Sequence, residues 1–128
     1  MHPAVLQALE FTRIIDVVCG FAATPLGAER LANLRPSSDP RRVTQWLAAT
    51  SEGVRFNEQA GGFALTATRD LPSILASLAI EGRALEPLRL MAVADYLESV
   101  DATRAAIKRA EGLFPTLKSL TLPVLWMV

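Results

Sequence analysis

The sequence predicts an all-α fold, an irregular bundle of about five helices, from three observations. Apolar residues recur at three- and four-residue steps through most of the chain, which lines them up along one side of a helix. Cap-forming residues stand directly before proline at Thr24-Pro25, Asp39-Pro40 and Glu86-Pro87, the arrangement of a helix start. Residues 63–68 alternate apolar and small polar side chains over too few positions for a strand.

The first two helices are expected within residues 3–33. Between Pro3 and Ala23 the apolar side chains that share one side are Val5, Leu6, Leu9, Ile14, Val17, Val18 and Phe21. Thr24 is typical of an N-cap and Pro25 of a first helical position, where the missing amide hydrogen costs nothing. The second helix should therefore run from Pro25 to about Asn33.

Asp39 and Pro40 begin the third helix, which should end near Gly61. The positions on its expected inner side are Val43, Leu47, Thr50 and Val54. The fourth helix should begin at Asp70-Leu71-Pro72 and end at Gly82. The residues expected to face inward from it are Ile74, Leu75, Leu78 and Ala79.

Pro87 opens the longest expected helix, about Pro87 to Glu111, which Gly112 and Pro115 should terminate. Its apolar side is formed by Leu90, Met91, Ala94, Leu97, Val100 and Ile107. Its charged side is formed by Asp95, Glu98, Asp101, Arg104, Lys108 and Arg109. Acidic residues precede basic ones along the axis, which agrees with the helix dipole and allows a pair between Asp101 and Arg104.

Composition restricts the classes of function. The chain of 128 residues suits one domain, and its 13 basic and 13 acidic residues cancel, so the broad positive surface of a dedicated nucleic-acid binder is absent. One cysteine, Cys19, and the lack of a secretory signal predict a cytoplasmic protein without an internal disulfide. No stretch is long enough to span a bilayer. We expect a helical segment over residues 1–118 and an apolar tail over residues 119–128, where the chain is truncated.

The inventory of reactive side chains predicts no catalytic residue, no metal site and no cofactor in this chain. One histidine, His2, and one cysteine cannot form a zinc site of the usual type, and a nucleophilic triad lacks its base. Gly61-Gly62-Phe63 has neither the spacing nor the lysine of a phosphate-binding loop. Acidic pairs on the longest helix, such as Asp95 with Glu98, are expected to be solvated surface.

One local cluster of cations is a candidate nucleic-acid contact. Arg35, Arg41 and Arg42 flank a proline-rich loop at a helix start, where two arginines and free amide groups can hold a phosphate. Trp46, one turn further on, can stack on a base. The alternative is that the arginines lie over apolar surface or pair with Asp39, and that Trp46 anchors a neighbouring helix.

The order of several short motifs resembles the opening of the second bacterial MutS class, the MutS-like ATPase with a small-MutS-related nuclease tail. The motifs are Leu9-Glu10-Phe11 with Ile14-Ile15, Thr24-Pro25-Leu26-Gly27, Leu34-Arg35-Pro36 with Asp39, Thr50-Ser51-Glu52-Gly53, Leu65 to Leu71, and Glu81 to Leu85. The similarity runs from about Leu6 to Phe114. Thr66-Ala67 departs from the family's glycine-containing turn, and the uncharged tail departs from its acidic continuation.

The resemblance implies that this chain is the N-terminal part of a MutS-type core and lever, the helical region that precedes the ATPase. It implies a homodimeric parent that binds ATP and magnesium, hydrolyses ATP, cuts nucleic acid, and controls DNA recombination and repair or rescues ribosomes. Its partners would be the remainder of the parent chain and, through other domains, DNA or the ribosome. Two other hypotheses remain: a free-standing helical adaptor that docks through Trp126, and a weak nucleic-acid-binding module.

Overall fold

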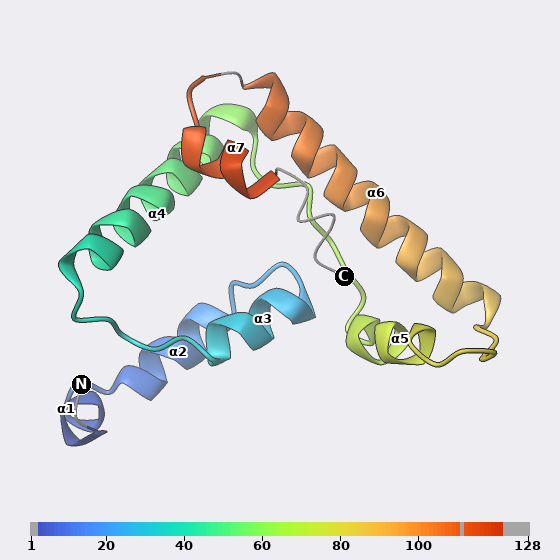
Figure 1. Cartoon of the computed structure of the whole chain (residues 1–128), viewed down its shortest axis with the longest axis horizontal. Helices are drawn as coiled ribbons and strands as arrows, with labels where there is room; N and C mark the ends of the chain where they lie inside the picture. Colours follow the sequence, from blue (N-terminus) through green and yellow to red (C-terminus); the bar gives the residue numbers. More distant parts are fainter. Residues whose placement is uncertain (1–2, 111, 122–128) are drawn as a thin grey trace. The chain divides into compact units, whose positions relative to one another are not determined.

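The computed structural model describes residues 3–110 and 112–121, and these ranges contain seven α-helices and no strand (Figure 1). The helices are α1 (Pro3–Ala8), α2 (Phe11–Cys19), α3 (Pro25–Ala32), α4 (Pro40–Ala60), α5 (Leu71–Leu78), α6 (Pro87–Arg109) and α7 (Pro115–Thr121). The prediction of an all-helical fold is confirmed. Within the described ranges, no helix is long and apolar enough to cross a membrane.

The chain forms two compact units, and each unit is built from two stretches of sequence. Unit 1 comprises Met1–Pro36 and Leu65–Ser99, and unit 2 comprises Ser37–Ala64 and Val100–Val128. The last residue of unit 1, Ser99, lies within α6, so this helix contributes to both units. The expected division into residues 1–118 and 119–128 stays a prediction, because the tail beyond Thr121 lies outside the described residues.

Unit 1 begins with two short helices where the sequence predicts one. Glu10 adopts a left-handed backbone conformation with φ 49° and ψ 36°, which ends α1 and turns the chain before α2. A side chain in this conformation costs roughly 1 kcal/mol. Apolar periodicity reports the spacing of side chains and not the backbone conformation, so it does not reveal the break. Gly20 ends α2 a few residues before the predicted boundary at Ala23.

In unit 1, α3 contacts both α5 and α2. Thr24 caps α3 as predicted: its buried hydroxyl accepts a hydrogen bond from the Gly27 N–H at 3.0 Å. On α5, Leu71 and Ile74 are fully buried, whereas Leu78, which was expected to face inward, is exposed. The buried side of α5 is thus rotated from the predicted one.

Ser99 of α6 fastens an extended segment of unit 1. Its hydroxyl accepts a hydrogen bond from the Thr66 N–H at 3.2 Å and lies 3.1 Å from the Thr66 carbonyl oxygen and 2.7 Å from that of Tyr96. The extended segment before α5 has no sheet to satisfy its backbone. One buried hydroxyl therefore replaces the hydrogen bonds that a neighbouring strand would supply.

Unit 2 is organised by α4 and α7, which pack together. The Asp39 carboxylate caps α4 by accepting from the Arg41 N–H at 3.0 Å, and Gly61 ends the helix with φ 78°. The predicted start and end of α4 are therefore confirmed. A small buried cluster holds the unit together, formed by Phe56, Ile107, Phe114 and Leu117.

Helix α7 is absent from the sequence prediction. Pro115 was expected only to stop the preceding helix, but it occupies the first position of a new one. Proline suits that position as well as it suits a terminator, so the residue alone does not distinguish the two. The predicted pair between Asp101 and Arg104 is present on α6 at 3.6 Å.

The largest departure from expectation concerns the apolar stripes of α2, α4 and α6. On α4, Leu47 and Val54 were expected in the core but are 63% and 53% exposed. The buried positions of α4 are Glu52 and Phe56 instead. The other exposed stripe residues are Ile14, Val17 and Val18 on α2 and Leu90, Met91 and Leu97 on α6. The predicted helices exist, but the described chain does not cover these sides of them.

Candidate functional site

A buried polar side chain of unit 2 with several hydrogen bonds is Glu52, which lies on α4 and is only 5% exposed. Its Oε2 accepts hydrogen bonds from the Thr116 N–H at 2.8 Å and from the Leu117 N–H at 3.0 Å. Its Oε1 accepts from the Thr116 hydroxyl at 2.8 Å. These two amides belong to the first turn of α7 and have no partner within that helix, so Glu52 acts as the cap of α7 from a different helix.

The surroundings of Glu52 favour its ionised form. Burial by itself would raise the pKa of this carboxyl group, because desolvation penalises the charge. The hydrogen bonds from Leu117 and Thr116 and the charge of Arg55 outweigh that effect, so the pKa of Glu52 lies below its ordinary value of 4.5. The positive end of the α7 dipole acts in the same direction. Glu52 is therefore a structural anion rather than a proton donor at neutral pH.

Aromatic packing surrounds the capped helix. The Phe56 ring lies 5.4 Å from the Phe114 ring in an edge-to-face arrangement and 4.8 Å from the Phe63 ring. Phe56 is fully buried and lies one helical turn after Glu52. The apolar contacts and the buried carboxylate thus act on the same two elements, α4 and the segment that contains α7.

The residues of the predicted nucleic-acid contact are only partly brought together. Arg42 and Trp46 form a pair on α4, with the guanidinium carbon 4.8 Å from the centre of the indole ring. The Arg41 side chain is exposed near the start of the same helix. Arg35 belongs to unit 1, where it donates to the Leu34 carbonyl oxygen at 2.9 Å. The nucleic-acid contact stays a prediction.

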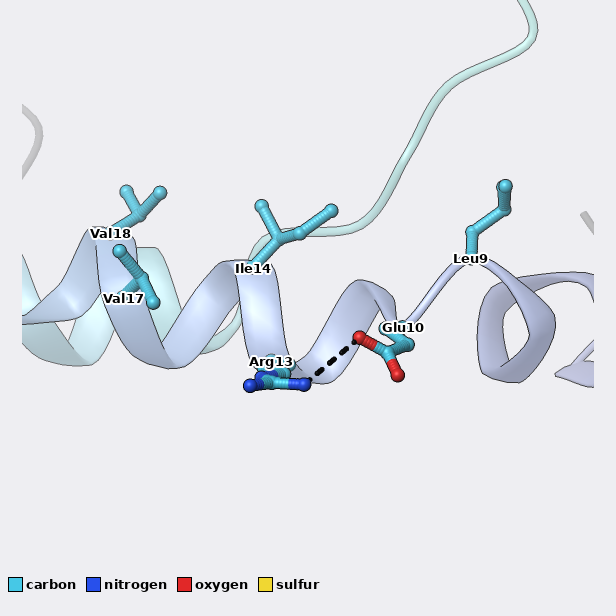
Figure 2. A pocket seen from close by; sticks show the side chains of 6 residues that line it. All are labelled: Leu9, Glu10, Arg13, Ile14, Val17 and Val18. Atoms are coloured by element: carbon cyan, nitrogen blue, oxygen red, sulfur yellow. Dashed lines mark hydrogen bonds and ion pairs between the residues drawn. The ribbon is translucent and has the colours of Figure 1, made fainter.

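A second surface feature is the α2 strip, which we define as Leu9, Ile14, Val17 and Val18. Figure 2 shows Leu9, Ile14 and Val18 projecting to one side and Val17 on the front of the helix, while Glu10 and Arg13 lie on the other side and form an ion pair at 3.3 Å. Together the six residues line a shallow apolar depression in unit 1. The ion pair is exposed and contributes little stability. An exposed apolar strip beside polar residues is a candidate contact surface.

Other candidate chemistry is sparse in the part of the chain that the structure describes. The Cys19 thiol is half-buried and lies 3.5 Å from the Ala28 carbonyl oxygen, an arrangement typical of a packing residue. No group of three or more histidine, cysteine, aspartate or glutamate side chains in those ranges could hold a metal ion. His2 and Trp126 lie outside the described residues.

Sequence reasoning missed Glu52 as a structural residue. In the sequence, Glu52 stands out only as part of the motif Thr50-Ser51-Glu52-Gly53, because nothing nearby distinguishes it from the other acidic residues of the 13 in the chain. A faint signal existed: Glu52 lies four residues before Phe56, so the two share one side of a helix. The partner amides of Thr116 and Leu117 are far away in sequence, and no local pattern connects them to Glu52.

Comparison with known proteins gives one consistent result. The chain is 35% identical over 113 residues to the protein named Endonuclease MutS2 from Geobacillus kaustophilus, an alignment that covers 88% of this chain and 13% of that protein. Proteins of the same name are 33% identical in Geobacillus thermodenitrificans (91% of this chain, 14% of the relative) and 32% identical in Symbiobacterium thermophilum (94% and 15%). The chain thus spans 13–15% of the length of these relatives. No family model and no solved structure matches it.

Proposed function

This chain is a segment of a protein of the MutS2 family. From that premise, we propose that it serves as a non-catalytic helical core and lever of that protein. A lever here is a helical region that transmits motion between other domains. The proposed role is to position and connect the parts of the parent protein. Chemistry would belong to residues elsewhere in that protein.

One observation carries this proposal: the apolar stripes of three helices are exposed in the described chain. Val17 on α2, Leu47 on α4 and Leu97 on α6 are each more than half exposed. A helix normally turns such a stripe toward a core. Exposed stripes on several helices therefore favour contacts with further polypeptide, and the matched relatives supply a length of chain about seven times greater.

The parent protein would supply the activity. By resemblance we propose that it is a homodimer that binds ATP and magnesium, that it acts in the cytoplasm, and that it controls DNA recombination and repair or rescues ribosomes. The relatives carry the name Endonuclease MutS2, which attributes nucleic-acid cleavage to those proteins. In this proposal the present chain contributes rigidity and contact surface to that activity.

Binding in trans tests the proposal. The chain would be added to Geobacillus kaustophilus Endonuclease MutS2 from which the matching segment of 113 residues has been deleted. Analytical ultracentrifugation should detect a complex, and the chain alone should show no ATP hydrolysis and no nuclease activity. Turnover by the purified chain, or no complex with the deleted protein, would contradict the proposal.

Variants of the α2 strip make the test specific. Replacing Ile14 and Val17 by asparagine should weaken the complex about tenfold or more, because buried apolar area is lost and amides are desolvated. Asp16→Asn is the matched control, since Asp16 is exposed on the same helix and does not line the strip. Equal binding by both variants would remove the α2 strip from the interface.

A second candidate function, weak nucleic-acid binding, is supported by the pair between Arg42 and Trp46. The guanidinium group lies over the indole ring near the start of α4, and Arg41 adds a second exposed cation. Such a group can contact a phosphate and stack against a base. This candidate ranks below the lever because the Arg42 guanidinium and the Trp46 ring already interact with each other and need no further ligand.

A further inference from the structure

We propose that Glu52 is a proton-operated latch: its ionised carboxylate holds α7 on α4, and protonation releases α7 while α4 stays folded. The two partners are Glu52 and the first turn of α7. The latch lies entirely within unit 2. It stands whether or not the lever role of the chain is correct.

The attachment of α7 depends on few contacts. A helix of seven residues is too short to be stable alone in water. Leu117 is its buried side chain, while Lys118, Ser119 and Leu120 are exposed. The hydrogen bonds described between α7 and α4 all go to Glu52. Removing those bonds should therefore leave α7 weakly held.

Protonation weakens all of these bonds together. The ionised carboxylate accepts from two N–H groups and one hydroxyl, and both of its oxygens are used. A protonated carboxyl group carries its own O–H and needs an acceptor for it. The groups around Glu52, two N–H groups and the Thr116 hydroxyl, act as donors in the ionised state. The remaining bonds lose their charge, and the attraction to the positive end of the helix is lost as well.

Glu52 is the acidic group whose protonation would change the contact between α4 and α7, because the other charged groups nearby are exposed. On α4, Arg55 acts on its charge, and Glu58 is exposed one turn further along. On α7, Lys118 is exposed. On α6, which contributes Ile107 to the same cluster, the charged groups Arg104, Lys108 and Arg109 are exposed. The hydrogen bonds described above hold the pKa of Glu52 below its ordinary value, so release is expected in the acid range.

Amide hydrogen exchange on the full chain, followed by NMR, tests the latch. The Lys118 N–H, which bonds to the Phe114 carbonyl oxygen at 2.9 Å, reports on α7. The Phe56 N–H lies inside α4 and reports on that helix. Protection factors would be measured from neutral pH down to about pH 3. Lys118 should lose protection at a higher pH than Phe56. Simultaneous loss at both positions means that unit 2 simply unfolds, and the latch is then refuted.

The charge-neutral variant separates the latch from general acid effects. Glu52→Gln should lower the protection of Lys118 at neutral pH by roughly tenfold or more, and should leave that of Phe56 much less changed. Glu58→Gln is the matched control on the exposed side of α4 and should behave like the unaltered chain. Full protection of Lys118 in Glu52→Gln would overturn the proposal.

Discussion

The Glu52 carboxylate accepts a hydrogen bond from the Leu117 N–H at 3.0 Å, although 65 residues separate the two in the sequence. Both residues are buried. The bond closes unit 2 by joining its first stretch of chain to its second. A buried charge is tolerated here because amide and hydroxyl donors replace the water that the carboxylate gives up.

Acid should destabilise the chain through Glu52. The pKa of this group is lower in the folded state than its ordinary value of 4.5, so the unfolded chain takes up the proton first as pH falls. The contribution of Glu52 is therefore complete above 4.5 and is lost as pH falls toward the folded-state pKa. Thermal unfolding at a series of pH values should show a smaller acid-induced decrease of Tm in Glu52→Gln. Parallel curves for the two proteins would contradict this expectation.

Phe56→Ala should be among the most damaging substitutions. The side chain is fully buried and contacts two other aromatic rings, so its removal leaves a cavity and costs about 3–5 kcal/mol. Denaturant unfolding followed by circular dichroism measures the loss. Phe21→Ala is the control: Phe21 is 82% exposed, and its loss should cost less than about 0.5 kcal/mol.

Ser99→Ala should destabilise unit 1 by about 1–3 kcal/mol, because the partly buried Thr66 N–H and carbonyl oxygen lose the Ser99 hydroxyl as their hydrogen-bond partner. Denaturant unfolding again gives the free energy. Ser51→Ala, at an exposed position of α4, provides the comparison and should change stability by less than about 0.5 kcal/mol. Equal effects of both substitutions would mean that the Ser99 hydroxyl does not fasten the extended segment.

Two glycines of α4 should respond in opposite directions to alanine. Gly53 lies inside the helix with no atom within 4 Å of an added Cβ, so Gly53→Ala should stabilise the chain by about 0.5–1 kcal/mol. Gly61 ends the helix with φ 78°, and Gly61→Ala should cost roughly 1 kcal/mol even though space is available. Calorimetric Tm values of the two variants should lie on opposite sides of that of the unaltered chain.

Nucleic-acid binding by the Arg42 and Trp46 pair makes a prediction about salt. Fluorescence anisotropy with a labelled oligonucleotide should show binding that weakens steeply as salt is added. Replacing Arg41 and Arg42 by alanine should lower the slope of that dependence by about 1–2. Arg109→Ala, on α6, removes one exposed cation elsewhere and is the control. Binding that ignores both salt and the double substitution excludes this function.

The existence of most helices was predictable from local patterns, but the side that each helix buries was not. Thr24 and Asp39 mark helix starts because capping is a short-range interaction between neighbours in sequence. Apolar periodicity shows that a helix has an apolar side without showing what covers it. Leu47 therefore lies exposed on α4 in the described chain, although its spacing suggests a core position.

In the candidate sites too, contacts between residues one helical turn apart were predictable, whereas contacts between residues distant in sequence were not. The pair between Arg42 and Trp46 is one helical turn apart, so the sequence places these residues together. Arg35 lies a few residues earlier, yet it belongs to unit 1 while they belong to unit 2. Glu52 caps Thr116 and Leu117, which lie 64 and 65 positions later in the sequence. No periodic pattern extends over such a separation.

By itself, the sequence determined the all-helical class, the starts of α3, α4 and α6, and the resemblance to the MutS2 family, because capping, periodicity and motif order are all properties of neighbouring residues. Tertiary structure alone decided that α1 and α2 are separate helices, that α7 exists, and that a glutamate of α4 caps it. Those outcomes depend on which distant segments meet, since a backbone break, a seven-residue helix and a buried charge are stable only when other parts of the fold supply their contacts.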